Sequence, residues 1–489
     1  MQTKLLNINI LCIFILLTNY LPMAKNYKKR TENKIVRLFE DYLKSKTAFF
    51  FEIEQFEEII NYYSVHNEPK KALAACLAAE NQYPYSIDIL ILKAQAYSNL
   101  EMDDEAFTTL DLAENLQPNE PEIFMLRGSL YSMNGDFDEA LEEYNKALEL
   151  SENLDEVYYH IGMVYQDMEN YDKAIEYLKK SISINIKNEN ALYDLAFCLD
   201  ITNRMEESVT FYHKFIDEDP YSSLAWYNLG ILYVKLNKLP DAIKAFDYAV
   251  VIDEDFASAY FNLGNAYLQN QQYQEALNAF TKAIEIEGPG SELYFLLATT
   301  YQNLEEYELS LKYHQKAFKL EPLYHEALFG AGFCLGKMDR WYEAVHFFNK
   351  ALKLNTENAL YWRSVAEADY KVGNLVSSLD AYEESATLNP SDPQTWLDWS
   401  FLVYEQGDHM KAIGLVEKGL DELPETAELY YRLTAYYMAS GMHKDALETL
   451  ENALVLNFEK HTDLLEFFTD LKVQKALFKI IEKYRKENS

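Results

Sequence analysis

The side chains that could do chemistry are scattered along this chain and form no catalytic motif. Its nine histidines include no HExxH pair, which would place two imidazoles on one helix face beside a glutamate base. The segment Gly332–Gly336 has the glycine spacing of a nucleophile elbow, but its central residue is Cys334 instead of serine. No P-loop and no GxGxxG motif occurs. We therefore expect no enzyme activity, no cofactor and no metal site.

The cysteines and the charge balance exclude further classes. The cysteines are too widely spaced to indicate a zinc cluster or a disulfide framework, at Cys12, Cys76, Cys198 and Cys334. The chain has 79 acidic and 44 basic residues, a formal net charge of −35. Such a surface repels the phosphates of nucleic acids and of anionic lipids. We expect neither nucleic-acid binding nor stable membrane insertion.

One pattern of residues recurs with a period of 34 along most of the chain. Apolar residues at helical spacing form one buried stripe, and a Gly or Ala in that stripe lets a second helix approach closely. A proline in phase ends the second helix of several units, because it cannot continue the hydrogen-bond ladder, at Pro84, Pro118, Pro220, Pro322, Pro390 and Pro424. The small residue of the first helix keeps the period at Ala94, Gly128, Gly162, Ala196, Gly230, Gly264, Ala298, Gly332 and Ala366. The small residue of the second helix does so from Ala72 to Ala446.

This pattern resembles the tetratricopeptide repeat family over about five-sixths of the chain. The resemblance implies an all-α, right-handed superhelical solenoid of about twelve 34-residue helix-turn-helix repeats with terminal capping helices. We expect the repeats over residues 53–460, a basic segment and capping helix over residues 23–52, and one or more capping helices over residues 461–489. Caps are needed because an array otherwise exposes an apolar face at each end.

Some units depart from the family pattern. Asp369 stands where Tyr is usual, Ser400 stands in the Gly or Ala place of a first helix, and Gly419 stands in an Ala place of a second helix. We expect these units to pack more loosely or to bend the array.

Residues 1–22 form an apolar leader. The unbroken apolar run Ile10–Leu17 follows Lys4, as in the core of a secretory signal, but Pro22, Met23 and Ala24 make a poor cleavage region. The run is shorter than the roughly 20 residues that span a bilayer. We favour a translation start at Met23, and hence a cytoplasmic protein. A signal peptide, and with it a periplasmic or secreted protein, is the alternative.

The resemblance also implies where a partner binds. Ligands of this family usually lie on the concave face formed by the first helices, where the second, fifth, sixth, ninth and twelfth places of each repeat point. Carried over to this chain, those places hold aromatic and amide side chains, at Tyr159, Tyr193, Tyr227, Asn228, Phe261, Asn262, Asn265, Phe295 and Phe329. Amides would bond the backbone of an extended peptide and rings would cover its side chains. The alternative is that these residues pack and solvate ordinary repeats.

The sequence predicts a non-catalytic scaffold or adaptor that binds a partner protein or peptide in the cytoplasm of a bacterium. The carboxylate clamp of chaperone-binding relatives is not supported, because Arg363 and Arg432 lack the remaining clamp residues. The alternatives are an exported scaffold for cell-envelope assembly and, more weakly, a regulatory subunit of an enzyme complex. A homodimer through a terminal repeat is compatible with this fold.

Overall fold

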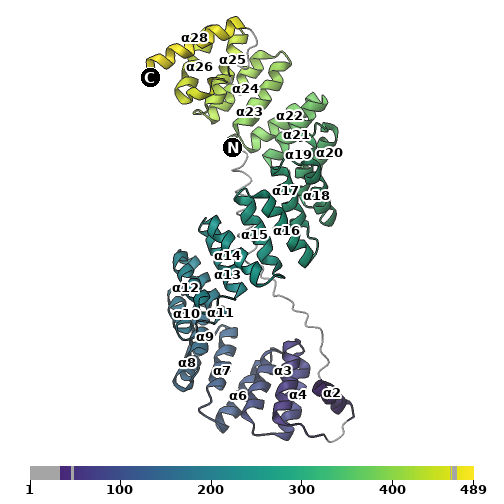
Figure 1. Cartoon of the computed structure of the whole chain (residues 1–489), viewed down its shortest axis with the longest axis vertical. Helices are drawn as coiled ribbons and strands as arrows, with labels where there is room; N and C mark the ends of the chain where they lie inside the picture. The colour runs from purple at the N-terminus through teal and green to yellow at the C-terminus, as the bar shows by residue number, and fades with distance from the viewer. Residues whose placement is uncertain (1–33, 46–48, 463, 465–470, 489) are drawn as a thin grey trace. The chain divides into compact units, whose positions relative to one another are not determined.

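The computed structural model describes residues 34–45, 49–462, 464 and 471–488, and every regular element in these ranges is a helix (Figure 1). Helices pack in consecutive pairs, and within each of the two compact units each pair packs on the next. The predicted all-α solenoid is thereby confirmed, while the repeat count and the segment boundaries stay predictions. The leader, the start at Met23 and the cleavage region lie outside the described residues. The chain divides into unit 1, residues 1–254, and unit 2, residues 255–489, which are described separately.

Unit 1 begins with α2 and continues as pairs of a first and a second helix. Its elements are α2 (Lys34–Ser45), α3 (Ile53–Val65), α4 (Pro69–Gln82), α5 (Ile87–Ser98), α6 (Asp103–Leu116), α7 (Pro121–Asn134), α8 (Phe137–Leu150), α9 (Leu154–Asp167), α10 (Tyr171–Ile184), α11 (Glu189–Ile201), α12 (Met205–Glu218), α13 (Ser223–Lys235) and α14 (Leu239–Ile252).

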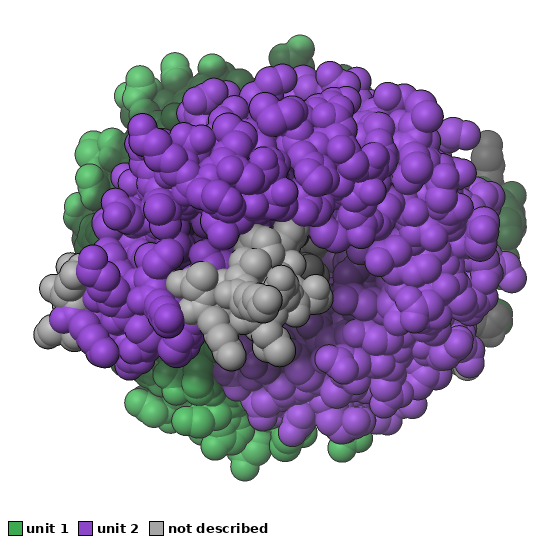
Figure 2. All heavy atoms as spheres, turned by 90° about the horizontal axis from the view of Figure 1, so that it is seen from above, with its two compact units in different colours: residues 1–254 green, residues 255–489 purple. Residues whose placement is uncertain are grey.

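Unit 2 repeats the same arrangement, and Figure 2 shows that it curves around a hollow. Its elements are α15 (Ala257–Gln269), α16 (Tyr273–Glu287), α17 (Ser291–Asn303), α18 (Tyr307–Leu320), α19 (His325–Lys337), α20 (Trp341–Leu354), α21 (Ala359–Val372), α22 (Leu375–Leu388), α23 (Pro393–Glu405), α24 (His409–Glu422), α25 (Ala427–Ala439), α26 (His443–Leu456), η1 (Phe458–Lys460) and α28 (Leu471–Asn488).

The turn inside each pair depends on one residue with left-handed backbone. Glycine adopts this conformation freely and asparagine with little penalty, whereas Glu101, Glu169 and Glu305 adopt it against their steric preference. The residue recurs with the sequence period, at Asn67, Glu101, Gly135, Glu169, Asn203, Asn237, Gln271, Glu305, Asp339, Gly373, Gly407 and Gly441. The same tight turn is therefore imposed in every pair, whatever side chain occupies it.

Prolines mark the helix ends as the sequence predicts. Pro84 and Pro220 each lie two residues beyond the last residue of a second helix, α4 and α12. Pro121 and Pro393 are the first residues of α7 and α23, where the missing N–H is not needed by the helix.

Close helix contact explains the phased glycines. A Cβ atom on Gly230 would lie 2.5 Å from Cε1 of Phe246 on the partner helix, and Gly264 meets Phe280 at the same distance. The first and second helices of these repeats touch where no larger residue fits, as the sequence predicts.

The terminal helices cover the ends of the array. Val36 and Phe39 of α2 are buried against Phe51 and Phe56, and Leu477 and Ile481 of α28 are buried with α25 and α26. These burials remove the apolar end faces from water, which is what capping requires.

At two of the atypical positions, Gly419 and Asp369, neighbouring side chains fill the space or bond the residue, and the looser packing or bending expected at these units stays a prediction. A Cβ atom on Gly419 would lie 2.8 Å from Cγ of Trp396, so the indole fills the space. Asp369 is buried and accepts hydrogen bonds from Nδ2 of Asn374 at 2.9 Å and Oγ of Ser377 at 2.6 Å. Both positions are thus compensated locally, by neighbours that the repeat position alone does not reveal.

Candidate functional site

The residues predicted to bind a partner fall into two groups. Unit 1 holds Tyr159, Tyr193, Tyr227 and Asn228, and unit 2 holds Phe261, Asn262, Asn265, Phe295 and Phe329. The two groups are described separately.

The tyrosines of unit 1 stand on α9, α11 and α13 and differ in exposure. Tyr193 keeps 39% of its surface exposed. Tyr159 is half-buried and donates a hydrogen bond from its hydroxyl to Oδ2 of Asp194 on α11, at 3.1 Å. The half-buried ring of Tyr227 lies 5.9 Å from the ring of Phe246 on α14. These side chains pack the repeats and still present polar or aromatic surface.

Asn228 connects two repeats. It is hydrogen-bonded to the hydroxyl of Tyr212 on α12. Burial raises the pKa of Tyr212, and the bond from Asn228 opposes that shift. The amide therefore satisfies a buried hydroxyl, a structural role that the sequence alone did not separate from peptide binding.

In unit 2 the predicted residues are more deeply packed. The half-buried rings of Phe295 and Phe329 lie 5.6 Å from His314 and 5.4 Å from Phe348, on the second helices of their own repeats. Asn262 and Asn265 are buried, and Nδ2 of Asn262 donates to the carbonyl of Ser258 at 3.2 Å. Phe261 is half-buried, 6.5 Å from Phe280. Packing of ordinary repeats explains this group.

The most exposed apolar surface on these helices of unit 1 includes residues that the sequence reading missed. Phe197 and Ile201 of α11 are 42% and 51% exposed, and with Tyr193 they follow one another at intervals of four. Residues at this spacing lie on one helix face. Their signal was a second apolar stripe on α11, opposite the buried stripe of Leu195 and Cys198.

The stripe on α11 continues onto the neighbouring first helices. Leu224 on α13 is exposed, and Ile231 on α13 and Met163 on α9 are half-buried. The helices are held side by side by hydrogen bonds from Tyr159 to Asp194 and from Lys235 to Asp200. We call this surface the unit 1 first-helix face, defined by Tyr159, Met163, Asp167, Tyr193, Asp194, Phe197, Ile201, Leu224, Tyr227 and Ile231.

The edge of this face at α9 is acidic. Burial raises the pKa of Asp167, and burial and the charge of Asp167 raise that of Asp194 against its bond from Tyr159. Neither carboxylate forms an ion pair with a described lysine or arginine. Asp200, nearer α13, is paired with Lys235. Negative charge is thus left uncompensated on one side of the apolar stripe.

A shallow polar pocket adjoins the same edge. It is lined by Asn153, Asp155, Glu156, Tyr159, His160, Asn185, Asn188 and Asn190. Nδ2 of Asn185 donates to Oδ2 of Asp155 at 2.8 Å, and Oδ1 of Asn188 accepts from the backbone N–H of Ala191 at 3.0 Å. Burial lowers the pKa of His160 despite the nearby Glu156. Several polar groups of the pocket are therefore already hydrogen-bonded within the protein. We interpret the pocket as a polar edge of the face instead of a separate ligand site.

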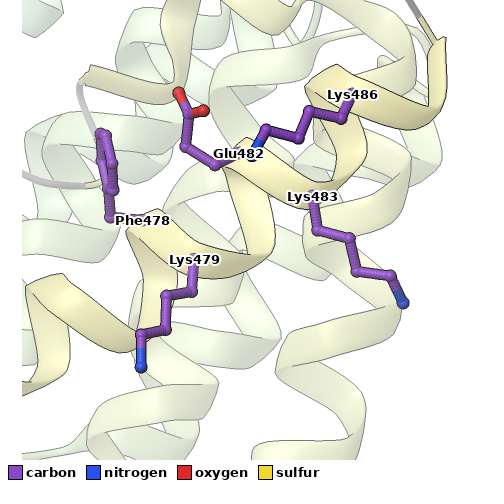
Figure 3. A pocket seen from close by; sticks show the side chains of 5 residues that line it. All are labelled: Phe478, Lys479, Glu482, Lys483 and Lys486. Carbon is purple, nitrogen blue, oxygen red and sulfur yellow. The ribbon is translucent and has the colours of Figure 1, made fainter.

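A second depression lies on α28 (Figure 3). Its lining side chains are Phe478, Lys479, Glu482, Lys483 and Lys486, all from one helix. A depression with walls from a single helix encloses no ligand, and we interpret it as the solvated side of the carboxyl-terminal cap.

No group of three or more His, Cys, Asp or Glu side chains in the described ranges could hold a metal ion. No helix in those ranges is long and apolar enough to cross a membrane.

The helix pairs and their period define a class of helical repeat proteins, and sequence comparison names it. Residues 119–187, 227–292 and 291–322 each match a tetratricopeptide repeat family model. The chain belongs to the tetratricopeptide repeat proteins.

Individual relatives are distant. The chain is 26% identical over 121 residues to Superkiller protein 3 of Schizosaccharomyces pombe, which is 23% of this chain and 9% of that protein. It is 29% identical over 152 residues to protein O-mannosyl-transferase TMTC1 of Homo sapiens, which is 30% of this chain and 16% of that protein. These matches span less than a fifth of either relative. A tetratricopeptide repeat protein from Parabacteroides merdae is 21% identical, with a TM-score of 0.41 over 53% of this chain and 99% of that one.

Proposed function

We propose that this protein is a non-catalytic scaffold that binds a partner protein or peptide through the first-helix faces of its repeats. The observation that supports this most directly is the exposed apolar stripe of Tyr193, Phe197 and Ile201 on α11. Contiguous apolar surface on a folded, highly charged protein costs free energy in water unless a partner covers it. The stripe belongs to the half of each repeat that the family uses for binding.

Site-specific photo-cross-linking tests this proposal. A photoreactive phenylalanine at position 197 should capture a small set of proteins in cells of the native host, identified by mass spectrometry. The same residue at Val251 on the second helix α14, which is 74% exposed, is the matched control. Equal capture at both positions, or capture at neither, would contradict a first-helix binding face.

The place of action is part of the proposal. We propose a cytoplasmic scaffold of a bacterium that starts at Met23. The second candidate, an exported scaffold, is favoured by the apolar run Ile10–Leu17. The mass of the intact protein from its host separates the two, because a chain that begins after residue 24 would contradict the cytoplasmic assignment.

A further inference from the structure

We infer that the unit 1 first-helix face binds a basic, apolar polypeptide segment, one that places leucine-like side chains over α11 and α13 and lysine or arginine beside α9. This inference deepens the proposed function and rests on it. It names the chemistry of the partner, which the repeat fold leaves open.

The apolar half of the argument is geometric. Tyr193, Phe197 and Ile201 form a ridge on α11, and Leu224 extends the apolar surface onto α13. Partner side chains packed over this ridge would be removed from water, at about 25 cal/mol for each Å² of apolar area buried. The exposed apolar residues span two helices and do not line the adjoining pocket, so they fit an extended or helical segment better than a small molecule.

The charged half of the argument is the asymmetry of the face. Asp167 on α9 and Asp194, the α11 residue that is bonded to Tyr159 of α9, have no basic partner among the described residues, and the charge of Asp167 opposes ionisation of Asp194. Further along, like charge from Glu120, Asp88 and Glu156 raises the pKa of Glu122 on α7, after the effect of burial. A cationic side chain would relieve this repulsion.

The apolar residues and the carboxylates together set the direction in which a partner segment would lie along the face. From α13 toward α7 the surface changes from apolar residues, with Asp200 neutralised by Lys235, to carboxylates that repel one another. A partner segment with apolar groups at one end and basic groups at the other matches this gradient. An acidic segment would meet uncompensated like charge, which is a cost that favours its exclusion.

The test uses the full chain and fluorescein-labelled synthetic peptides of Gly and Ser that carry several Leu and several Lys residues. Fluorescence anisotropy should detect binding of this peptide, and much weaker binding of peptides with Glu in place of Lys or Ala in place of Leu. Phe197→Ala should weaken binding about tenfold, as loss of a central aromatic contact does. Phe197→Leu should retain most of the affinity for the peptide, and Val251→Ala should leave the affinity unchanged.

The charge contribution is tested separately. The double variant Asp167→Asn with Asp194→Asn should weaken binding of the Lys peptide by about threefold to tenfold and abolish its preference over a Gln peptide. Equal binding of the Lys and Glu peptides, or unchanged binding by Phe197→Ala with an intact helical spectrum, would overturn the inference. Cross-linking at position 197 to a partner whose contacting segment is acidic would also overturn it, while leaving the proposed scaffold function standing.

Discussion

Arg127 in unit 1 and His314 in unit 2 are two polar residues buried at repeat positions that hold aliphatic or aromatic residues in most other repeats. Arg127 on α7 stands where later repeats have Leu195, Leu229 and Leu263, and His314 on α18 stands where other repeats have phenylalanine. The guanidinium of Arg127 is surrounded by carboxylates, with Asp111 at 3.0 Å, Glu114 at 2.8 Å and Glu143 at 3.4 Å.

His314 has a different environment. Neither of its ring nitrogens has a hydrogen-bond partner within the described residues, and its ring lies against Gly330 on α19. Burial lowers the pKa of His314 to about 3, so the ring is neutral. A permanent charge is buried only with compensating charges, whereas a titratable group can be buried by losing its proton.

The largest effect should come from breaking the charged cluster. Arg127→Ala should lower the free energy of unfolding by about 3 kcal/mol, because it leaves the buried Glu143 with less compensation. Urea unfolding monitored by circular dichroism measures the change. Arg340→Ala, which removes an ion pair to Glu343 on the surface of unit 2, is the control and should have no measurable effect. Equal effects of the two variants would contradict the comparison.

The fit between His314 and Gly330 should give the next largest effect. A Cβ atom on Gly330 would lie 2.3 Å from Cε1 and 2.4 Å from Nε2 of His314, so Gly330→Ala should cost about 2 kcal/mol or slightly more. In the control Gly414→Ala the new Cβ meets nothing within 4 Å, and the helix should gain up to about 1 kcal/mol. Amide hydrogen exchange of α18 and α19 locates the change. Destabilisation by both variants would indicate a backbone effect instead of a steric one.

The neutral imidazole predicts a dependence on pH. Because the folded pKa is lowered from 6.5 to about 3, the unfolded chain binds the proton more tightly. The stability contribution is full above about pH 6.5 and is lost as the pH falls toward 3, which gives a loss of about 2 kcal/mol between pH 7 and pH 5. His314→Phe should remove this loss. If the difference in unfolding free energy between the wild type and His314→Phe is the same at pH 7 and pH 5, the assignment of His314 as a buried neutral imidazole is contradicted.

The smallest effect should come from the corresponding pair in unit 1. Tyr212 and Asn228 occupy the repeat positions of His314 and Gly330, and they are hydrogen-bonded to each other. Tyr212→Phe should cost about 1 kcal/mol, because it leaves the amide without this partner. The same urea titration measures it. Removing the polar group should therefore destabilise unit 1 in Tyr212→Phe, whereas His314→Phe should stabilise unit 2 at pH 5. A change of the unfolding free energy in the same direction for both variants would contradict the difference between the two sites.

The fold could be predicted because each of its determinants is local and repeats. The small residues and the apolar stripe recur every 34 residues, and prolines stand in phase with them in several units; each acts within one helix pair or between neighbours. The left-handed turn residue cannot be assigned from its type where it is a glutamate or a glutamine, as at Glu101 and Gln271, because these side chains carry no turn signal.

The candidate site could be predicted only in part. The first-helix aromatics were found from their places in the repeat, but those places do not tell whether a ring packs or is exposed. Tyr193 is exposed and Phe329 is stacked on Tyr361 with ring centroids 4.6 Å apart, although both hold the fifth place. Phe197 and Ile201 were not predicted, because the sequence does not show whether a neighbouring helix packs over this apolar stripe or leaves it exposed.

The sequence by itself determined the helix pairs, their order and their close contacts, since these follow from side-chain periodicity along one short stretch of chain. The tertiary structure decided which polar groups are compensated and which apolar groups stay exposed. The same repeat place holds the hydrogen-bonded Tyr212 in one unit and, in the other, His314, whose ring nitrogens have no hydrogen-bond partner among the described residues. The difference arises from the residue of the next repeat that contacts each side chain, which is Asn228 for Tyr212 and Gly330 for His314. Burial and electrostatics depend on these contacts between repeats, which only the folded structure forms.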